Sequence, residues 1–312
     1  MTDSRRTAAR RIGAVALVLT ISTAVATVIA QQQFVFFVSV TTADGTRVIT
    51  DLRTEDVRVE EGGRAANVLR LIPVTWPVKV TVLVDNGFGT GPLLLHYRNG
   101  LKDFFNALPT GVEASLLTLS PQPRWLVRPT NDRTQLLKGA ERLTPDDSAP
   151  RFVDALIEAA NRIEDENRKE TTYFPVIVMV STTGPEGSMP RDRDINRMVE
   201  QFGKYPARVH VIMLGTGGTS PNQILGARQV QVGKYIADQT GGRYEAIAAP
   251  TRITSLLGEF GEMVAAAHDF QSQQYMVVAE RPAGSTGPMG PLSMGLTRPG
   301  LRFSVTAQGL KP

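Results

Sequence analysis

Residues 78–84 read Val-Lys-Val-Thr-Val-Leu-Val and run directly into Asp85-Asn86-Gly87-Phe88-Gly89. Similar apolar runs recur at residues 114–119, 176–180 and 209–214. Runs of this length with little alternation between apolar and polar residues are typical of strands covered on both faces. Because helical patterns separate the runs, the repeated order of strand and helix predicts an α/β fold with a doubly wound, mostly parallel sheet.

Five amphipathic stripes predict the helices that cover this sheet. They lie at residues 101–108, 136–143, 152–163, 195–202 and 253–264. Residues 123–127 follow the second apolar run too closely for a helical crossover. We therefore expect them to form an antiparallel edge strand, where Pro123 is tolerated at the start.

Shorter strand patterns flank this region on both sides. Residues 34–40, 56–60 and 67–72 precede it, and residues 274–279 and 301–306 follow it around a Gly/Pro-rich loop at residues 282–291. We expect the two late strands to pair with each other. The predicted organisation is therefore a β leader at 31–74, a main domain at 75–268, and C-terminal strands at 269–312 that pack on the leader as a small antiparallel unit.

Composition excludes several classes of function. The chain has 312 residues, no cysteine and three histidines, so disulfides, thiolate catalysis and a Cys- or His-rich zinc site are not expected. The formal net charge is +4, but residues 1–30 hold four arginines against one aspartate. Without them, 30 basic and 29 acidic residues leave +1, which gives no electrostatic reason to expect nucleic acid as a partner.

The first thirty residues resemble a secretory signal. Two arginine pairs, Arg5-Arg6 and Arg10-Arg11, precede the uncharged stretch Ile12–Ala30. This pattern predicts a signal peptide cleaved near Gln31 and export to the periplasm or the extracellular space. The alternative is an uncleaved anchor in the inner membrane, because nineteen uncharged residues are long enough to span a bilayer.

The sequence resembles a von Willebrand factor A (VWFA) domain. The resemblance rests on the order of elements, on Asp85 at the end of the first predicted strand, and on the Gly-rich turn at residues 215–218. Residues 51–63 and 295–303 are similar to the leader and closing strand of the acidobacterial-type VWFA-related proteins. The resemblance implies a Rossmann-like domain whose ligands bind at the carboxyl ends of the strands.

The resemblance also implies a magnesium site, called MIDAS, which this sequence has largely lost. The family pattern is Asp-x-Ser-x-Ser followed later by a Thr and an Asp. Asp85 matches, but Gly87 and Gly89 replace the serines, the Thr position falls near Pro150, and the second Asp position reads Thr183. Mg²⁺ requires six hard oxygens in octahedral geometry. We therefore expect a degenerate MIDAS and neither a metal nor a cofactor.

The same edge is the predicted partner-binding crevice, acting without metal. Free N–H groups of the helix that follows would favour an anionic group, and Phe88 would be an exposed aromatic anchor. The alternative is that this crevice binds nothing and that the partner contacts the β leader or the edge strand around Trp125. The crevice residues are Asp85, Asn86, Gly87, Phe88, Gly89, Thr183 and Gly184.

The sequence contains no recognisable catalytic constellation. The turn at residues 215–218 lacks the spacing of a nucleotide-binding loop, and no Gly-x-Ser-x-Gly elbow is present. Nothing in the sequence places a base beside Ser181, and Gly233-Lys234 is expected at the start of a helix. The predicted function is an exported, non-enzymatic protein–protein interaction or adhesion-type module. The alternatives are an exported hydrolase or transferase with an unrecognised site and a membrane-anchored subunit of an envelope complex.

Overall fold

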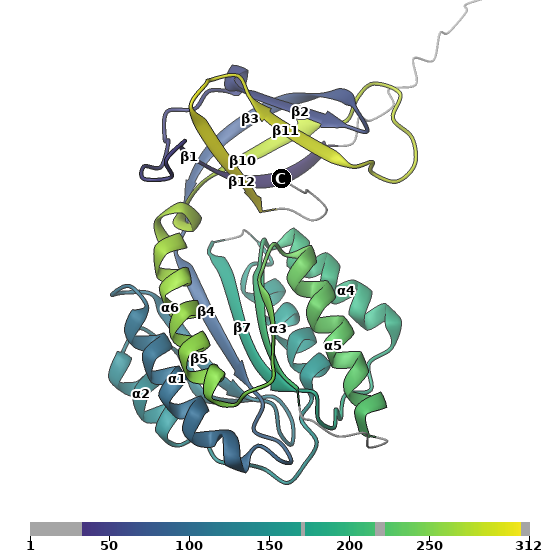
Figure 1. The fold of residues 1–312 in the computed structure, drawn as a ribbon. Coiled ribbons are helices and arrows are strands. Elements are labelled where there is room, and N and C mark those ends of the chain that lie inside the picture. Colours follow the sequence, from purple (N-terminus) through teal and green to yellow (C-terminus); the bar gives the residue numbers. More distant parts are fainter. Residues whose placement is uncertain (1–32, 170–171, 216–221, 307–312) are drawn as a thin grey trace, which may run out of the picture. The chain divides into compact units, whose positions relative to one another are not determined.

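The computed structural model describes residues 33–169, 172–215 and 222–306, and contains two six-stranded sheets within those residues (Figure 1). The predicted signal or anchor at residues 1–30 lies outside the described residues, as do residues 216–218 of the predicted Gly-rich turn. None of the helices in the described ranges is long and apolar enough to cross a bilayer.

The first sheet has the strand order β6-β5-β4-β7-β8-β9. All neighbours from β5 to β9 pair in parallel, and β6 pairs with β5 antiparallel, as predicted for the edge strand. The prediction of a mostly parallel sheet is confirmed. The bounds are Val78–Val84 for β4, Glu113–Thr118 for β5, Arg124–Thr130 for β6, Phe174–Thr182 for β7, Arg208–Leu214 for β8 and Tyr244–Ile247 for β9.

Helices cover both faces of this sheet. Val82 packs under α1 (Leu94–Ala107), α2 (Arg133–Glu141) and α6 (Thr251–Ser272). Its neighbour Leu83 packs under α3 (Phe152–Glu166), α4 (Asp192–Lys204) and α5 (Asn222–Gln239). Successive residues of a strand point to opposite faces, so a strand buried on both sides must be apolar throughout. This accounts for the apolar, fully buried second half of β4 at residues 82–84, whereas Lys79 and Thr81 in its first half are only half-buried.

The second sheet is antiparallel throughout, with the order β11-β2-β3-β10-β1-β12. It combines strands from both ends of the chain. The bounds are Gln33–Thr42 for β1, Val57–Glu61 for β2, Arg64–Thr75 for β3, Gln273–Glu280 for β10, Leu292–Leu296 for β11 and Leu301–Thr306 for β12; a short 3-10 helix, η1, spans Thr54–Asp56.

Three expectations from the sequence need correction. The late strands β10 and β12 do not pair with each other but lie on either side of β1, because β11 first takes the chain to the opposite edge beside β2. Gly233 and Lys234 lie inside α5 rather than at a helix start. The short strand β9 and most of α5 were not predicted, since neither carries a long apolar stripe.

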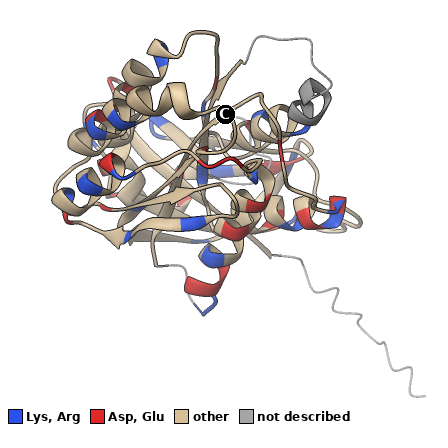
Figure 2. Ribbon diagram, turned by 90° about the horizontal axis from the view of Figure 1, so that it is seen from below, with Lys and Arg blue, Asp and Glu red and all other residues tan. Residues whose placement is uncertain are grey.

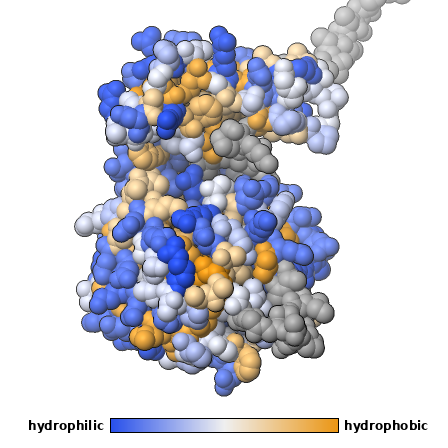
Figure 3. Space-filling model, viewed as in Figure 1, coloured by the Kyte–Doolittle hydropathy of each residue, from blue (hydrophilic) through white to orange (hydrophobic). Residues whose placement is uncertain are grey.

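The charged residues of the described part are interspersed, with basic and acidic segments mixed over the ribbon in Figure 2. On the face shown in Figure 3, hydrophobic residues lie in separate spots between larger hydrophilic areas. Figure 2 shows no large region of a single charge among the described residues, so we next consider the edge of the parallel sheet.

Candidate functional site

The candidate site lies where the parallel strands end. The carboxyl ends of β4, β5 and β7 meet at one edge, the position where ligands bind in open α/β sheets. The loops that begin there include residues 85–90 after β4 and 183–190 after β7. The loop at 144–151, which leads into α3, joins them through the hydrogen bonds described below.

Asp85 is fully buried at this edge, with an exposed fraction of 0%. Its carboxylate accepts hydrogen bonds from the Gly87 N–H (2.9 Å), the Ser181 Oγ (3.0 Å), the Thr182 N–H (3.2 Å) and the Thr182 Oγ1 (3.3 Å). Burial raises the pKa of Asp85, and these four donors oppose that shift. A carboxylate has about four acceptor positions. Because Asp85 follows β4 and the donors Ser181 and Thr182 belong to β7, these hydrogen bonds connect the ends of the two strands.

Gly87 occupies a space with no room for a side chain. A Cβ atom added there would lie 2.6 Å from the Cδ of Pro150, 2.6 Å from the Oγ of Ser120 and 2.8 Å from the carbonyl oxygen of Ser148. Carbon atoms in contact are ordinarily about 3.5–4.0 Å apart. The loop before α3 thus fills the position where the resembling family places its first serine.

Hydrogen bonds hold that loop against the end of β4. The Asp146 N–H donates to the Asn86 carbonyl (2.7 Å), and the Phe88 N–H donates to the Ser148 carbonyl (2.9 Å). The Asn86 amide donates to the carbonyl of Thr144 (3.1 Å). Asp146 itself accepts from the Ser148 N–H (2.8 Å), a bond that lowers the pKa of Asp146. The loop carboxylate closest to the edge is therefore engaged within its own loop.

The structure separates the predicted crevice residues into two groups. Asp85 and Asn86 are buried, at 0% and 2% exposed, and Gly87 is enclosed, so these three do not offer a surface to a partner. Phe88 is 59% exposed, and Gly89 has a φ of 85° with open space around it. The buried residues thus close the base of the predicted crevice. Only the tip of the loop after β4, at Phe88 and Gly89, is accessible.

Three backbone N–H groups in the turn between β4 and the following helix already have acceptors. The Gly87 N–H bonds to Asp85, the Phe88 N–H to Ser148, and the Thr90 N–H to the Gly87 carbonyl (3.1 Å). Because these donors already have acceptors inside the protein, they leave no ready-made anion site at that turn.

Thr183 and Gly184, the remaining predicted residues, are half-buried beyond the end of β7. The Thr183 N–H donates to the Leu214 carbonyl (2.9 Å), and the Gly184 N–H donates to the Thr182 Oγ1 (3.2 Å). The fully buried Gln229 of α5 donates its amide to the Gly184 carbonyl (3.1 Å). The sequence analysis did not single out Gln229, since nothing in its pattern marks it as facing this edge.

The loop after β7 also closes the start of α3. Glu186 accepts from the Phe152 N–H (2.8 Å), and Ser188 accepts from the Asp154 N–H (3.0 Å). These bonds satisfy donors at a helix N-terminus, where a carboxylate is stabilised by the helix dipole. The Glu186 carboxylate is thus the anion at the N-terminus of α3. The sequence analysis did not predict Glu186 or Ser188 at this position.

Large apolar side chains are exposed beside the closed loops. Phe88 is 59% exposed and Met189 is 91% exposed. Both loops join the one before α3: Phe88 bonds to Ser148, and the Gly187 N–H donates to the Pro150 carbonyl (2.8 Å). We call the exposed side chains of Phe88 and Met189 the apolar edge surface. Leu95, on the first turn of α1, is also 64% exposed.

The polar groups at this edge do not form a recognisable catalytic or metal-binding set. Ser181 is buried, and its Oγ donates to Asp85 rather than to a histidine. His210 lies in β8, where its Nδ1 accepts from the Arg243 N–H (3.0 Å). In the described part of the chain, no three His, Cys, Asp or Glu side chains are grouped so that they could hold a metal ion.

Comparison with known proteins gives likeness in structure only. The sequence matches no protein-family model and no curated protein. The structure is similar to "von Willebrand factor type A from Catenulispora acidiphila", with a TM-score of 0.46, 12% identity, 81% of this chain covered and 71% of that one. It is also similar to the vWF domain of the type V pili tip protein Mfa5 from Porphyromonas gingivalis, with a TM-score of 0.44, 10% identity, and 62% and 97% of the two chains covered.

Proposed function

We propose that this chain is an exported, non-enzymatic protein-binding module of the VWFA-related type, which binds its partner without metal at the apolar edge surface. The observation that carries the proposal is the enclosure of Gly87 by Pro150, Ser120 and Ser148. It closes the position of a metal-binding serine and leaves Phe88, the next residue, at the surface.

The residues present do not fit a magnesium ion. Mg²⁺ needs six oxygens in near-ideal octahedral geometry and loses its water reluctantly. Gly87 and Gly89 provide no side-chain oxygen, and Asp85 already accepts hydrogen bonds from four internal donors. A metal-dependent mode of partner binding is therefore not part of this proposal.

The apolar edge surface suits a protein partner. Aromatic residues and methionine are enriched at protein–protein interfaces, and a few such anchors contribute most of the binding energy. Methionine is flexible and polarisable, so that it adapts to the shape of a partner. The backbone of Phe88 is held by the hydrogen bond from its N–H to the Ser148 carbonyl, which lowers the backbone entropy lost on binding.

We propose from the local geometry of Ser181 that the chain has no enzymatic activity. The hydroxyl of Ser181 is buried and directed to Asp85, and a serine needs an accessible position and an adjacent base to act as a nucleophile. Export is proposed from the charge pattern of residues 1–30. N-terminal sequencing of protein from native cells should begin near Gln31, whereas an intact Ile12–Ala30 segment in the membrane fraction would favour the anchored alternative.

Partner capture from the native cell envelope tests the central part of the proposal. We expect wild-type protein to retain a specific partner equally well in EDTA and in Mg²⁺. Phe88→Ala should weaken that binding by more than about 1 kcal/mol, as expected for an anchor. Tyr235→Ala is the matched control, because Tyr235 is an exposed aromatic on α5, at 50% exposure. Loss of binding in EDTA, or equal effects of the two variants, would contradict the proposal.

A further inference from the structure

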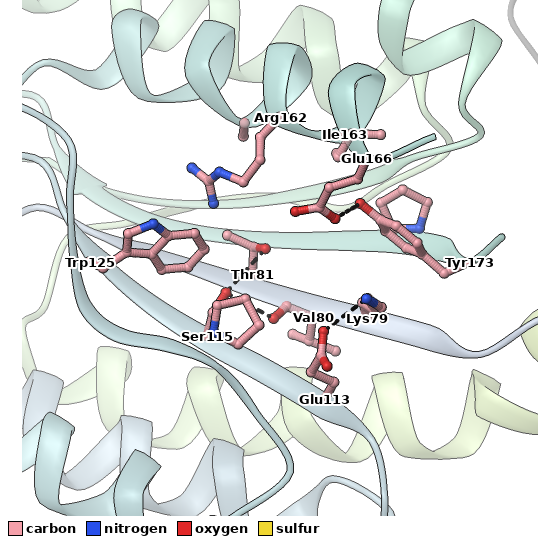
Figure 4. Close-up of a pocket in the computed structure, with 13 residues that line it drawn as sticks. Lys79, Val80, Thr81, Glu113, Ser115, Trp125, Arg162, Ile163, Glu166 and Tyr173 are labelled. Carbon is pink, nitrogen blue, oxygen red and sulfur yellow. Dashed lines mark hydrogen bonds and ion pairs between the residues drawn. The ribbon is translucent and has the colours of Figure 1, made fainter. Parts of the chain in front are cut away.

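A pocket lies near the amino ends of the parallel strands, at the end of the sheet opposite to the candidate site (Figure 4). It is bounded by the last turns of α3 and by the first residues of β4 and β5, with β6 at one side. Its free volume is about 30 Å³, and the hollow around it opens to solvent. It is therefore separate from the edge where the proposed partner binds.

The pocket exists because the residues facing α3 become small and polar toward this end. Along β4 the residue facing α3 changes from Leu83 to Thr81, and along β5 it changes from Leu117 to Ser115. On α3 the opposing residue is Ala159. Ser115 is buried, yet its hydroxyl makes only long contacts, 3.3 Å and 3.4 Å, so it retains capacity for a shorter hydrogen bond.

Arg162 directs its guanidinium group toward this space. The group lies 4.0 Å from the centre of the Trp125 ring, and the side chain is only 20% exposed. An arginine has five N–H donors. Among the described residues its hydrogen-bond acceptor is Glu158, at a long 3.4 Å. Most of the donors on a largely buried cation thus remain available to an acceptor in the pocket, as Figure 4 shows.

The acidic residues of the pocket are bound elsewhere. Glu166 accepts the hydroxyl of Tyr173 at 2.6 Å, and Glu113 pairs with Lys79 at 3.0 Å. The Lys79 ammonium also lies 4.6 Å from the centre of the Tyr173 ring. These contacts engage both carboxylates with partners other than Arg162, as the dashed lines in Figure 4 show.

We infer that this pocket binds a carboxylate group. The planar guanidinium of Arg162, braced by Trp125, offers a fork that matches two carboxylate oxygens. The hydroxyls of Ser115 and Thr81 supply additional donors on the floor of the pocket. The carboxylate belongs either to a small organic acid or to the C-terminus of a peptide, because both present the same two oxygens.

Nuclear magnetic resonance of the tryptophan indoles tests this inference on the whole mature chain. The protein has two tryptophans, and Trp76 does not line the pocket, so its indole signal is an internal control. The probes are sodium benzoate with benzamide as its neutral match, and a tripeptide acid with the same tripeptide amide. We expect benzoate or the tripeptide acid to move the Trp125 signal in a saturable way, and the neutral partners to leave it in place.

Variants assign the effect to Arg162. Arg162→Gln should abolish the movement caused by the acid, and Arg162→Lys should retain a weaker form of it. Arg151→Gln, at an exposed position just before the first residue of α3, should titrate as the wild type does. The inference is overturned if neither acid moves the Trp125 signal at tens of millimolar, if the amides act like the acids, or if R162Q titrates normally. Because no protein partner is involved, these outcomes are independent of the proposed function.

Discussion

The Cβ position of Gly87 lies 2.6 Å from the Cδ atom of Pro150, although the two residues are 63 positions apart in the chain. This contact places the loop before α3 against the end of β4. It makes glycine a packing requirement, since any side chain at this position would displace the loop. The space at this edge of the sheet, beside Gly87, is therefore filled by protein atoms.

Gly87→Ser should therefore destabilise the fold instead of restoring a metal site. The added side chain would overpack the space between Pro150 and Ser120, at a cost of about 1–3 kcal/mol. Gly91→Ser is the matched control, because a Cβ atom at Gly91 meets nothing within 4 Å. Urea unfolding compares the two variants. An unchanged stability of Gly87→Ser, or a Mg²⁺-dependent gain in it, would show that the loop is not packed as described.

Asp85→Ala should be destabilising in the presence and in the absence of metal. Removing the carboxylate leaves the buried donors of Ser181, Thr182 and Gly87 without their acceptor, which costs at least about 2 kcal/mol. Thermal unfolding in EDTA and in Mg²⁺ should give the same loss. A loss seen in Mg²⁺ alone would mean that Asp85 acts through a metal ion and not through these hydrogen bonds.

Acid should weaken the fold through His210. Burial, with Arg208 and Arg243 nearby, lowers the pKa of His210 from 6.5 to about 3. Between those values the unfolded chain binds a proton at this residue and the folded chain does not. Stability is therefore complete above pH 6.5 and falls as the pH falls toward 3. The loss should reach about 2 kcal/mol by about pH 5, before most carboxylates titrate.

Two histidine variants measured by urea unfolding isolate this effect. His210→Asn keeps an acceptor for the Arg243 N–H and removes the titrating ring, so the slope of stability against pH between about pH 5 and 7 should decrease. His268→Asn, near the end of α6, is the control for replacing a histidine elsewhere in the chain. Equal slopes for wild type and His210→Asn would refute the assignment.

The loop between β10 and β11 should depend on one buried ion pair. Arg281 donates to both oxygens of Glu61, at 3.0 Å and 2.9 Å, and to the carbonyl of Gly287 (2.9 Å). Arg281→Met leaves the Glu61 carboxylate buried without its partner and should lower the melting temperature by several degrees. Adding Glu61→Met should recover part of that loss. If the double variant is no more stable than Arg281→Met, the buried charge is not the cause.

The sequence predicts those features of the fold that depend on residues close together in the chain. The mainly apolar run at residues 78–84 predicted a strand covered on both faces. Its consecutive residues Val82 and Leu83 point to opposite faces, so both must be apolar when both faces are buried. The stripe at residues 253–264 predicted α6 for a similar local reason. The position of Asp85 directly after β4, at the carboxyl end of that strand, was also predicted.

Contacts between distant residues could not be predicted in the same way. Nothing in the local pattern indicates that Pro150 reaches Gly87, or that Glu186 satisfies the first N–H groups of α3. The predicted pairing of β10 with β12 is wrong for the same reason, because strand pairing depends on where the intervening β11 docks. These contacts between distant residues determine which side chains and backbone N–H groups remain accessible to a partner.

The most direct test of the account is a calorimetric titration of the mature protein with Mg²⁺, Ca²⁺ and Mn²⁺. We predict no saturable heat for any of the three ions, because Asp85 is consumed by internal donors and Pro150 fills the space beside Gly87. An ion bound at micromolar affinity in the wild type, and lost in Asp85→Asn, would contradict the account.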